Sequence, residues 1–484
     1  MNPQVVFKHF EALSQIPRGS GNEKAVSDYI ANFARNLNLK TVQDELFNLI
    51  IFKEGTSSYE NKQPVILQAH LDMVCEKNAG TEHDFLKDPI QFIVEGDLIK
   101  ANGTTLGADN GIGVAFCMAL LEANDLQHPP LEIVLTSQEE TGMDGAFGLN
   151  YDLFKGRRMI NLDSSDDKVF TLGCAAGASA IFHIDADYQK NQRPDGISYT
   201  INISGLKGGH SGSDIHLGRG NSLRILGHLL HELTYDFDFV DISHISGGMK
   251  MNAIPREATV IITFDKKDKD SIIKTIEDYK KSVKELYRIA DPDLEITYTP
   301  CENPKRFFSQ FATRDMINIL MLLPSGVQNM SLELPGLVNA SNNIGVIETL
   351  SNEDDDEEIK ITSMLRGSSE HFINQMSAQI DCLASTSDVC LEFIERSPAW
   401  VYNPNSALLE TAKKCYQDLF GEMPTLEATH GGLECGIFGN KLPRIEIIAY
   451  GATCNELHTP NEYLSISSTE KVWNFLQSLL KELD

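Results

Sequence analysis

Apolar runs rich in β-branched residues recur up to about residue 180, and polar residues follow each of them. Residues 65–69 and 131–136 are two such runs, and between them residues 114–122 carry apolar side chains at helical spacing. Apolar runs that alternate with helical segments are typical of a parallel sheet in an α/β protein. Such sheets carry functional side chains at the carboxyl ends of their strands, so the polar residues after each run are the first site candidates.

The alternating pattern stops near residue 180 and returns after about residue 397. We therefore expect one catalytic domain that is built from residues 1–180 and 397–484. Residues 181–396 differ, because alternating strand patterns and later strand–helix successions predict an inserted α+β domain. A similar cycle of strands and helices in the two halves of this insert suggests two α+β repeats. Within it, the acidic run at residues 352–358 is interpreted as a solvated loop.

Capping residues mark the starts of two helices. Asp109 or Asn110 is placed to cap the helix that continues through residues 114–122. Ser467 and Glu470 have the spacing of a capping box at the start of the last helix. The glycines that flank Asp109 predict a closer approach of the backbone than a cap alone requires.

Five strand ends or loops carry side chains of the kind that bind metal ions. The segments are His70-x-Asp72, Asp109, Glu139-Glu140, Asp163 and His458. Each segment alone has a bland explanation, such as a solvated strand exit, a helix cap or a loop histidine. Together, two histidines and three acids can hold two divalent ions about 3.5–4 Å apart, with one acid as a bridge. Mixed nitrogen and oxygen ligands favour zinc or its neighbours over magnesium or calcium.

Composition narrows the classes of function. The chain has 484 residues, 42% of them hydrophobic, which suits two or three domains with a large core. Its net charge of −28 argues against nucleic acid and anionic membranes as partners. No apolar run approaches the roughly 20 residues of a membrane span, and the start lacks the apolar core of a signal peptide. The nine cysteines include no CxxC pair, so we expect reduced thiols and a cytoplasmic location.

Several longer strings resemble a known enzyme family. In chain order they are Leu-Gln-Ala-His-Leu-Asp-Met-Val, Leu-Gly-Ala-Asp-Asn-Gly-Ile-Gly, Glu-Glu-Thr-Gly-Met-Asp-Gly-Ala, Asn-Leu-Asp-Ser, Gly-Gly-His-Ser-Gly and His-Gly-Gly-Leu-Glu-Cys-Gly. They resemble the dizinc exopeptidases of the aminoacylase and carboxypeptidase G type, and within these the aminoacyl-histidine dipeptidase branch. The resemblance covers nearly the whole chain. It implies an α/β catalytic domain with a mixed sheet flanked by helices, interrupted by an α+β lid domain.

The resemblance also implies the ligands of two metal ions. His70 and Asp163 would hold one ion, Glu140 and His458 would hold the other, and Asp109 would bridge them. Zinc is the expected metal, with cobalt and manganese as alternatives. A cis peptide bond is expected directly after Asp109.

Further roles are implied for residues that do not bind metal. Asp72 would orient the first histidine ligand, and Glu139 would be the general base that activates water. In the lid domain, His210 would contact the substrate carbonyl oxygen and Asn252 would bind the substrate. Arg366 would grip the substrate's carboxylate, to which its planar fork is suited.

The implied activity is hydrolysis of dipeptides with a free amino terminus, Xaa-His among them, by a homodimer built through the lid domain. One alternative is an aminoacylase or carboxypeptidase that uses the same dizinc site. The other is an inactive peptide-binding sensor, which the loss of Glu139 or of a ligand would favour; none of these residues is lost. The sequence contains no GxSxG motif, which argues against catalysis by a nucleophilic serine.

Overall fold

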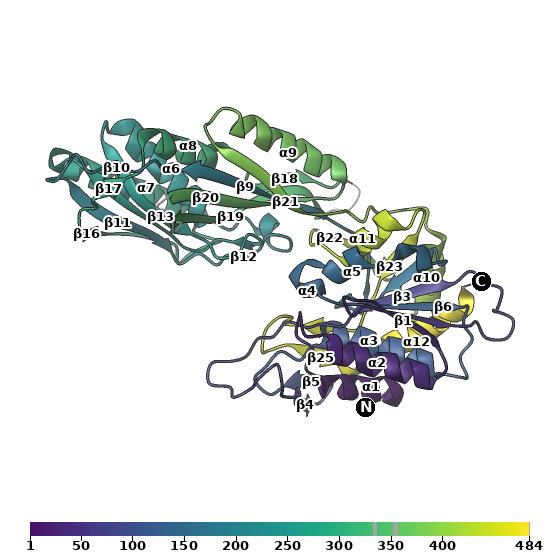
Figure 1. The fold of residues 1–484 in the computed structure, drawn as a ribbon. Coiled ribbons are helices and arrows are strands. Elements are labelled where there is room, and N and C mark those ends of the chain that lie inside the picture. The colour runs from purple at the N-terminus through teal and green to yellow at the C-terminus, as the bar shows by residue number, and fades with distance from the viewer. Residues whose placement is uncertain (333–335, 352–356, 484) are drawn as a thin grey trace. The chain divides into compact units, whose positions relative to one another are not determined.

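The computed structural model describes residues 1–332, 336–351 and 357–483 (Figure 1). The chain divides into two compact units. Unit 1 comprises Met1–Gly173, Trp400–Ala428 and Leu433–Asp484, and unit 2 comprises Cys174–Ala399 and Thr429–Gly432. Unit 1 is therefore assembled from sequence on both sides of unit 2.

An eight-stranded mixed sheet forms the centre of unit 1, with the strand order β1-β2-β6-β3-β7-β23-β8-β22. The strands are β1 (Lys40–Gln43), β2 (Leu49–Lys53), β6 (Leu131–Thr136), β3 (Val65–His70), β7 (Arg158–Asn161), β23 (Glu446–Ala449), β8 (Val169–Cys174) and β22 (Thr425–Thr429). The central strands β6, β3, β7 and β23 are parallel, whereas β2 and β8 join them antiparallel. The strand β23 comes from late in the sequence, yet it separates β7 from β8.

Helices flank this sheet on both sides (Figure 1). They are α1 (Gln4–Ser14), α2 (Lys24–Asn36), α3 (Ala108–Glu122), α5 (Asp144–Gly148), α10 (Ala407–Phe420), α11 (Glu434–Lys441) and α12 (Ile466–Glu482). The helix α3 is buried around most of its circumference because it packs between α1 and β3. The expected mixed sheet flanked by helices is thus confirmed.

A smaller four-stranded sheet adds to unit 1, with the order β24-β25-β5-β4. Its strands are β24 (Cys454–Asn455), β25 (Tyr463–Ser465), β5 (Leu98–Ala101) and β4 (Phe92–Glu95). The loop between β24 and β25 carries His458. The strand β25, which follows that loop, pairs with β5 from an early segment of the chain, so the end of the loop is held in place.

Both predicted helix caps were wrong. The residue at the N-cap of α3 is Gly107, and Asp109 and Asn110 lie inside the assigned helix with non-helical backbone angles. The last helix starts two residues earlier than predicted, and Ser465 caps it by accepting from the backbone N–H of Ser468. The hydroxyl of Ser467 donates to Asp97 instead, at 2.7 Å. The residues around Ser467 could not reveal this contact, because Asp97 lies far away in the sequence.

Unit 2 is built on a nine-stranded sheet. Eight of its strands follow the order β16-β11-β15-β13-β19-β20-β9-β21, and the ninth, β18, pairs with β19. The strands are β9 (Ala176–Asp185), β11 (Ile197–Ser204), β13 (Val240–Gly247), β15 (Ala258–Phe264), β16 (Glu295–Cys301), β18 (Gly326–Met330), β19 (Val338–Ser351), β20 (Glu357–Gly367) and β21 (Cys390–Ser397). Residues 352–356 of the acidic run lie outside the described residues, so the loop expected there stays a prediction.

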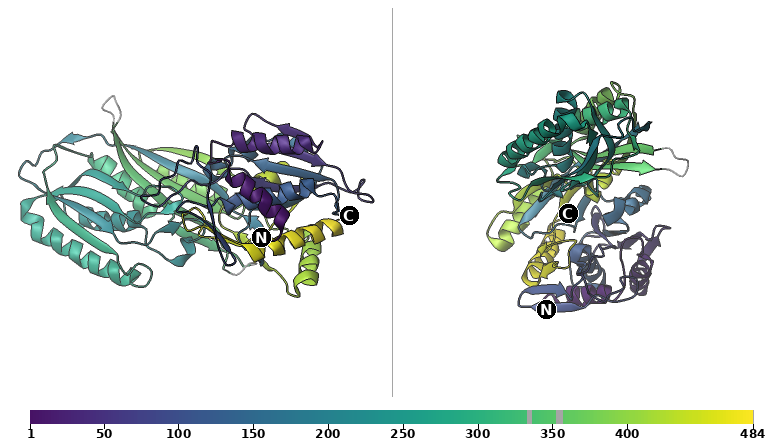
Figure 2. Two further views of the ribbon diagram at one scale, coloured as in Figure 1. Left: turned by 90° about the horizontal axis from the view of Figure 1, so that it is seen from below. Right: turned by 90° about the vertical axis from the view of Figure 1, so that its left-hand side faces the viewer.

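Four helices share one core with this sheet: α6 (Ser222–Asp236), α7 (Lys269–Tyr287), α8 (Gln310–Leu322) and α9 (Glu370–Ala384). The strands β16, β11, β15 and β13 precede β19, β20 and β21 in the sequence, and the two groups join where β13 pairs with β19. The earliest strand, β9, lies in the second group, between β20 and β21. The suggested repeats would therefore share one continuous sheet; that they are repeats stays a prediction. Figure 2 gives two further views of the ribbon.

Two chain-wide features bear on the expectations from composition. None of the nine cysteines, all of which lie among the described residues, forms a disulfide. Among the described residues, no helix combines the length and the apolar character that a membrane span needs.

Candidate metal centre and active site

The candidate metal ligands of unit 1 gather at the carboxyl ends of its parallel strands. The strands β6, β3 and β7 are direct neighbours. His70 is the last residue of β3, Asp163 follows β7 by two positions, and Glu139 opens the short helix α4 (Glu139–Gly142) after β6. Parallel strands end at one edge of a sheet, so residues far apart in the sequence converge here.

The carboxylate of Asp109 lies between the two histidines. Its Oδ1 is 3.0 Å from Nε2 of His70, and its Oδ2 is 3.3 Å from Nε2 of His458. The imidazole of His70 also lies 3.5 Å from Asp163 Oδ1, and that of His458 lies 3.1 Å from Glu140 Oε2. Two imidazole–acid pairs therefore share one central carboxylate.

This donor set fits divalent cations. Ligand atoms of His70, Asp109 and Glu140 all lie within 4.8 Å of one another. Glu140 Oε1 is buried and has no hydrogen-bond partner among the described residues. Acids outnumber imidazoles in this cluster, and buried carboxylates are costly unless cations compensate their charge. Bound cations would supply both the missing partner and the missing charge.

The pKa values around the centre reflect the same excess of buried acids. Burial raises the pKa of Glu139 well above its usual range; His70 opposes this shift, and Asp163 and Glu140 add to it. Burial likewise raises the pKa of Glu140 and of Asp163. The carboxylates of Asp109 and Glu140 raise the pKa of His458 to about 10. Metal ligands bind in their deprotonated forms, so metal uptake here would release protons.

Asp72 supports the centre from the far side of the His70 ring. It is fully buried, and its Oδ1 lies 3.3 Å from Nδ1 of His70, on the ring side away from Asp109. Its two oxygens also accept the backbone N–H groups of Glu139 and Glu140 at 3.1 and 3.2 Å. One carboxylate thereby fixes both the first histidine and the start of α4, as expected of a group that orients a metal ligand.

Sequence reasoning missed a second supporting acid, Glu462. Its buried carboxylate accepts the backbone N–H groups of four consecutive residues, 106–109, at 2.7–3.3 Å. A Cβ on Gly107, where φ is +70°, would lie 2.6 Å from Met73 Sδ. The expected close backbone approach is thus confirmed there. An acid four residues after His458 was the available signal.

Side-chain hydrogen bonds link the residues on either side of Asp109 to the rest of the centre. The Asp109–Asn110 peptide is cis, as the resemblance implies. The side-chain amide of Asn110 donates to Oδ1 of Asp163. Arg18, which is 3% exposed, donates to the backbone carbonyls of Leu71 and Asp72 and to that of Gly107. These bonds tie the end of β3 and the start of α3 together.

The three candidate residues of unit 2 also lie close to one another. His210 belongs to the strand β12 (Gly209–His210), which pairs with β14 (Ala253–Ile254) directly after Asn252. Nη2 of Arg366 lies 3.4 Å from Nε2 of His210, and its Nε donates to Ser211 Oγ at 3.1 Å.

Within the described part of the chain, the guanidinium of Arg366 has no acidic partner. Arg366 is 5% exposed, and no carboxylate of the described residues forms an ion pair with it. Burial lowers its pKa to about 10. A buried cation without a counter-ion favours an anionic ligand.

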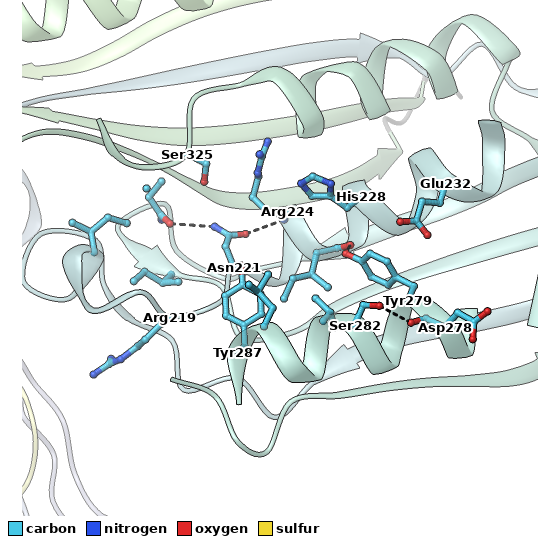
Figure 3. Close-up of a pocket in the computed structure, with 17 residues that line it drawn as sticks. Arg219, Asn221, Arg224, His228, Glu232, Asp278, Tyr279, Ser282, Tyr287 and Ser325 are labelled. Atoms are coloured by element: carbon cyan, nitrogen blue, oxygen red, sulfur yellow. Dashed lines mark hydrogen bonds between the residues drawn. The ribbon is translucent and has the colours of Figure 1, made fainter. Parts of the chain in front are cut away.

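Unit 2 also contains a cavity of about 570 Å³ between α6 and α7 (Figure 3). Its lining includes Arg219, Arg224, Glu232, Tyr279 and Tyr287. None of the predicted site residues lines it. Arg224 donates to the carbonyls of residues 320 and 321 at 2.6 Å each, at the end of α8, so part of its charge serves the fold.

Comparison with known proteins shows which family the chain belongs to. The pattern of peptidase family M20/M25/M40 matches residues 66–482. The chain belongs to this family. As a member of peptidase family M20/M25/M40 it is a peptide-bond hydrolase.

Two relatives match over the full length of this family member. The cytosol non-specific dipeptidase of Escherichia coli (strain K12) is 34% identical over 489 residues, covering 100% of this chain and 98% of the relative. The crystal structure of aminoacylhistidine dipeptidase from Vibrio alginolyticus has a TM-score of 0.87 at 32% identity, covering 100% and 97% of the two chains. Aminopeptidase PepT from Bacillus cereus shares the fold, with a TM-score of 0.60 at 14% identity over 100% and 99% of the chains.

Proposed function

We propose that this peptidase hydrolyses dipeptides with a free amino terminus, Xaa-His and other Xaa-Yaa, with two divalent metal ions. The observation that carries the proposal is the Asp109 carboxylate, which directs one oxygen to His70 and the other to His458. A bridging ligand between two ions needs this arrangement. The two full-length relatives, both named dipeptidases, support dipeptides as the substrate class.

The contacts support a division of ligands between the two ions. His70 and Asp163 would hold one ion, His458 and Glu140 would hold the other, and Asp109 would bind both. The nitrogen and oxygen donors suit zinc, with cobalt and manganese next. When bound, such ions lower the pKa of water and polarise the peptide carbonyl.

Glu139 is the proposed general base. Its carboxylate would take a proton from the attacking water and pass it to the nitrogen of the leaving amine. Burial raises the pKa of this carboxyl group, which suits a group that must hold the proton between the two steps. The backbone N–H of Glu139 donates a hydrogen bond to Asp72, and this bond fixes the backbone that carries the base.

Unit 2 supplies the proposed substrate contacts. His210 would donate to the oxyanion that forms from the carbonyl oxygen. Asn252 would bind the substrate beside it. The buried guanidinium of Arg366 would pair with the substrate's terminal carboxylate, for which its fork geometry is suited.

A substrate panel tests the function against its alternatives. We expect metal-reconstituted protein to cleave free dipeptides, and to act poorly on N-acyl amino acids and on longer peptides. Preference for N-acyl amino acids would identify an aminoacylase, and release of single residues from longer peptides a carboxypeptidase. Absence of hydrolysis with full metal occupancy would identify a binding protein.

Replacing Arg366 by alanine should weaken dipeptide binding by about 100-fold, because a carboxylate loses two charge-assisted hydrogen bonds. Zinc occupancy should stay intact, since Arg366 is not itself a proposed ligand. KM for a free dipeptide and metal content are the measurements. An unchanged KM in the metal-replete variant would place the carboxylate anchor elsewhere, with the loop that follows His430 as the next candidate.

Assembly and location complete the proposal. We expect a homodimer formed through unit 2, which sedimentation analysis of the metal-loaded protein would detect as twice the mass of the chain. The Escherichia coli relative carries the word cytosol in its name, and we propose a cytoplasmic location with dipeptides, not nucleic acid or membranes, as partners.

A further inference from the structure

A buried polar network joins the three strands that carry the metal centre. Glu434, the first residue of α11, is 1% exposed. Its Oε2 accepts from Nε2 of Gln68 at 2.5 Å and from Oγ1 of Thr136 at 2.7 Å. Gln68 accepts in turn from Nδ2 of Asn161 at 2.5 Å. The network therefore contacts β3, β6 and β7 at once.

Each of these partners lies on its strand two or three residues before a residue of the proposed centre. Gln68 precedes His70 by two positions on β3, so both side chains point to the same face of the sheet. Asn161 precedes Asp163 by the same interval, and Thr136 is the register partner of His70 on β6. A shift of Glu434 would thus be transmitted to the ends of all three strands.

The two carboxylate oxygens of Glu434 differ in their hydrogen bonds. Gln68 and Thr136 both donate hydrogen bonds to its Oε2. Its Oε1 is buried without a partner among the described residues. Oδ1 of Asn161 is likewise buried without a partner. Leaving buried acceptors unpaired is costly, so the network has room for one more proton. Burial raises the pKa of Glu434 to about 8, with Asp163 and Asp72 adding to the shift, so this carboxyl can carry that proton.

We propose that Glu434 is a positioning residue of the metal centre, which holds β3, β6 and β7 in one arrangement as an uncharged hydrogen-bonding group. Among the described residues its hydrogen-bond partners are Gln68 and Thr136, and neither is a proposed metal ligand. It acts through Gln68 and Thr136, which fix where His70 and Glu139 leave the sheet. The inference rests on the proposed function only where turnover is concerned.

The variant Glu434→Gln distinguishes the hydrogen-bonding role of this side chain from any role of its charge. In the variant Glu434→Gln the side chain would keep an oxygen for the two donors, and its amide N–H would replace the carboxyl proton. This variant should therefore retain kcat within about threefold, because the hydrogen bonds persist. The variant Glu434→Ala should lower kcat by about 10- to 100-fold, the usual effect of removing a group that orients metal ligands. KM for a free dipeptide should change little.

A second glutamate of the same sheet gives a matched control. Glu132 lies near the amino end of β6, is 3% exposed, and accepts the backbone N–H groups of Lys155 and Gly156 at 3.0 Å each. The variant Glu132→Ala should lower the melting temperature but leave kcat unchanged. A loss of kcat in Glu434→Ala without a matching loss in Glu132→Ala would distinguish positioning from stability.

The test has a readout that needs no turnover. Cobalt-substituted protein reports ligand geometry in its visible absorption spectrum, and we expect Glu434→Ala to shift that spectrum while Glu132→Ala and Glu434→Gln do not. If Glu434→Ala fails to fold, Thr136→Val removes one hydroxyl donor and should shift the spectrum and lower kcat severalfold.

Three results would overturn the inference. They are a wild-type spectrum and kcat in folded Glu434→Ala, a Glu434→Gln variant as impaired as the alanine variant, and an unaffected Thr136→Val. If the wild-type chain binds cobalt but cleaves no dipeptide, the proposed function fails while the spectral comparison still decides the role of Glu434.

Discussion

Replacing Glu139 by glutamine is expected to abolish nearly all turnover, by a factor of at least about 100, as for the loss of a positioned acid–base group. The amide cannot take a proton from water, yet it has the shape of the carboxyl group. The backbone N–H of residue 139 would still donate to Asp72, so the start of α4 should stay in place. Fold and metal content should therefore be unchanged.

Three measurements check this expectation: kcat on a free dipeptide, metal content per chain, and the melting temperature. Glu45→Gln, in an exposed turn of unit 1, is a matched control with the same change of charge. We expect full activity from the control. Near-normal turnover of metal-replete Glu139→Gln would require another base.

Removing the central carboxylate should have a still larger effect. Asp109→Ala takes away the only carboxylate that contacts both histidines among the described residues. Metal ions contribute several kcal/mol to such a reaction, and each 1.36 kcal/mol is a factor of about ten. Turnover should therefore fall by at least about 1000-fold. At least one ion per chain should be lost, because Asp109 is proposed to bind both.

Metal removal from the wild-type chain provides the matching experiment. A chelator should abolish turnover, and zinc or cobalt should restore it in the wild type but not in Asp109→Ala. Added metal should also raise the melting temperature of the wild type, because a ligand that binds only the folded state stabilises it. Restoration of full activity in Asp109→Ala would contradict the bridging role.

The sequence predicted that the candidate ligands would lie close together because several of them follow apolar runs in a repeated pattern. Their binding of metal stays a prediction. Apolar runs ended at His70, before Glu139 and before Asp163, and parallel strands bring such ends together. The positions of these residues could therefore be expected from local patterns and a family resemblance. Their distances could not, because they depend on strand order and on the loops around them.

The errors and omissions have a common physical origin. The cap of the last helix was misplaced because Asp97, far away in the sequence, takes the hydroxyl of Ser467. Glu462 and Glu434 were missed because an acid's partners, four backbone N–H groups in one case and two side chains in the other, come from distant segments. Local spacing carries no information about such contacts.

The position of β23 has a consequence for how the chain is made. During synthesis the amino-terminal part of a chain emerges first, at about 5–20 residues per second. Until Glu446–Ala449 has emerged from the ribosome, the strands on either side of its place in the sheet have unpaired edges, which attract other chains. His458 emerges later still. The proposed two-ion centre would therefore be complete only after residue 458 has been synthesised. A premature stop between β7 and His458 would yield a protein that retains His70 but lacks a proposed ligand of the second ion.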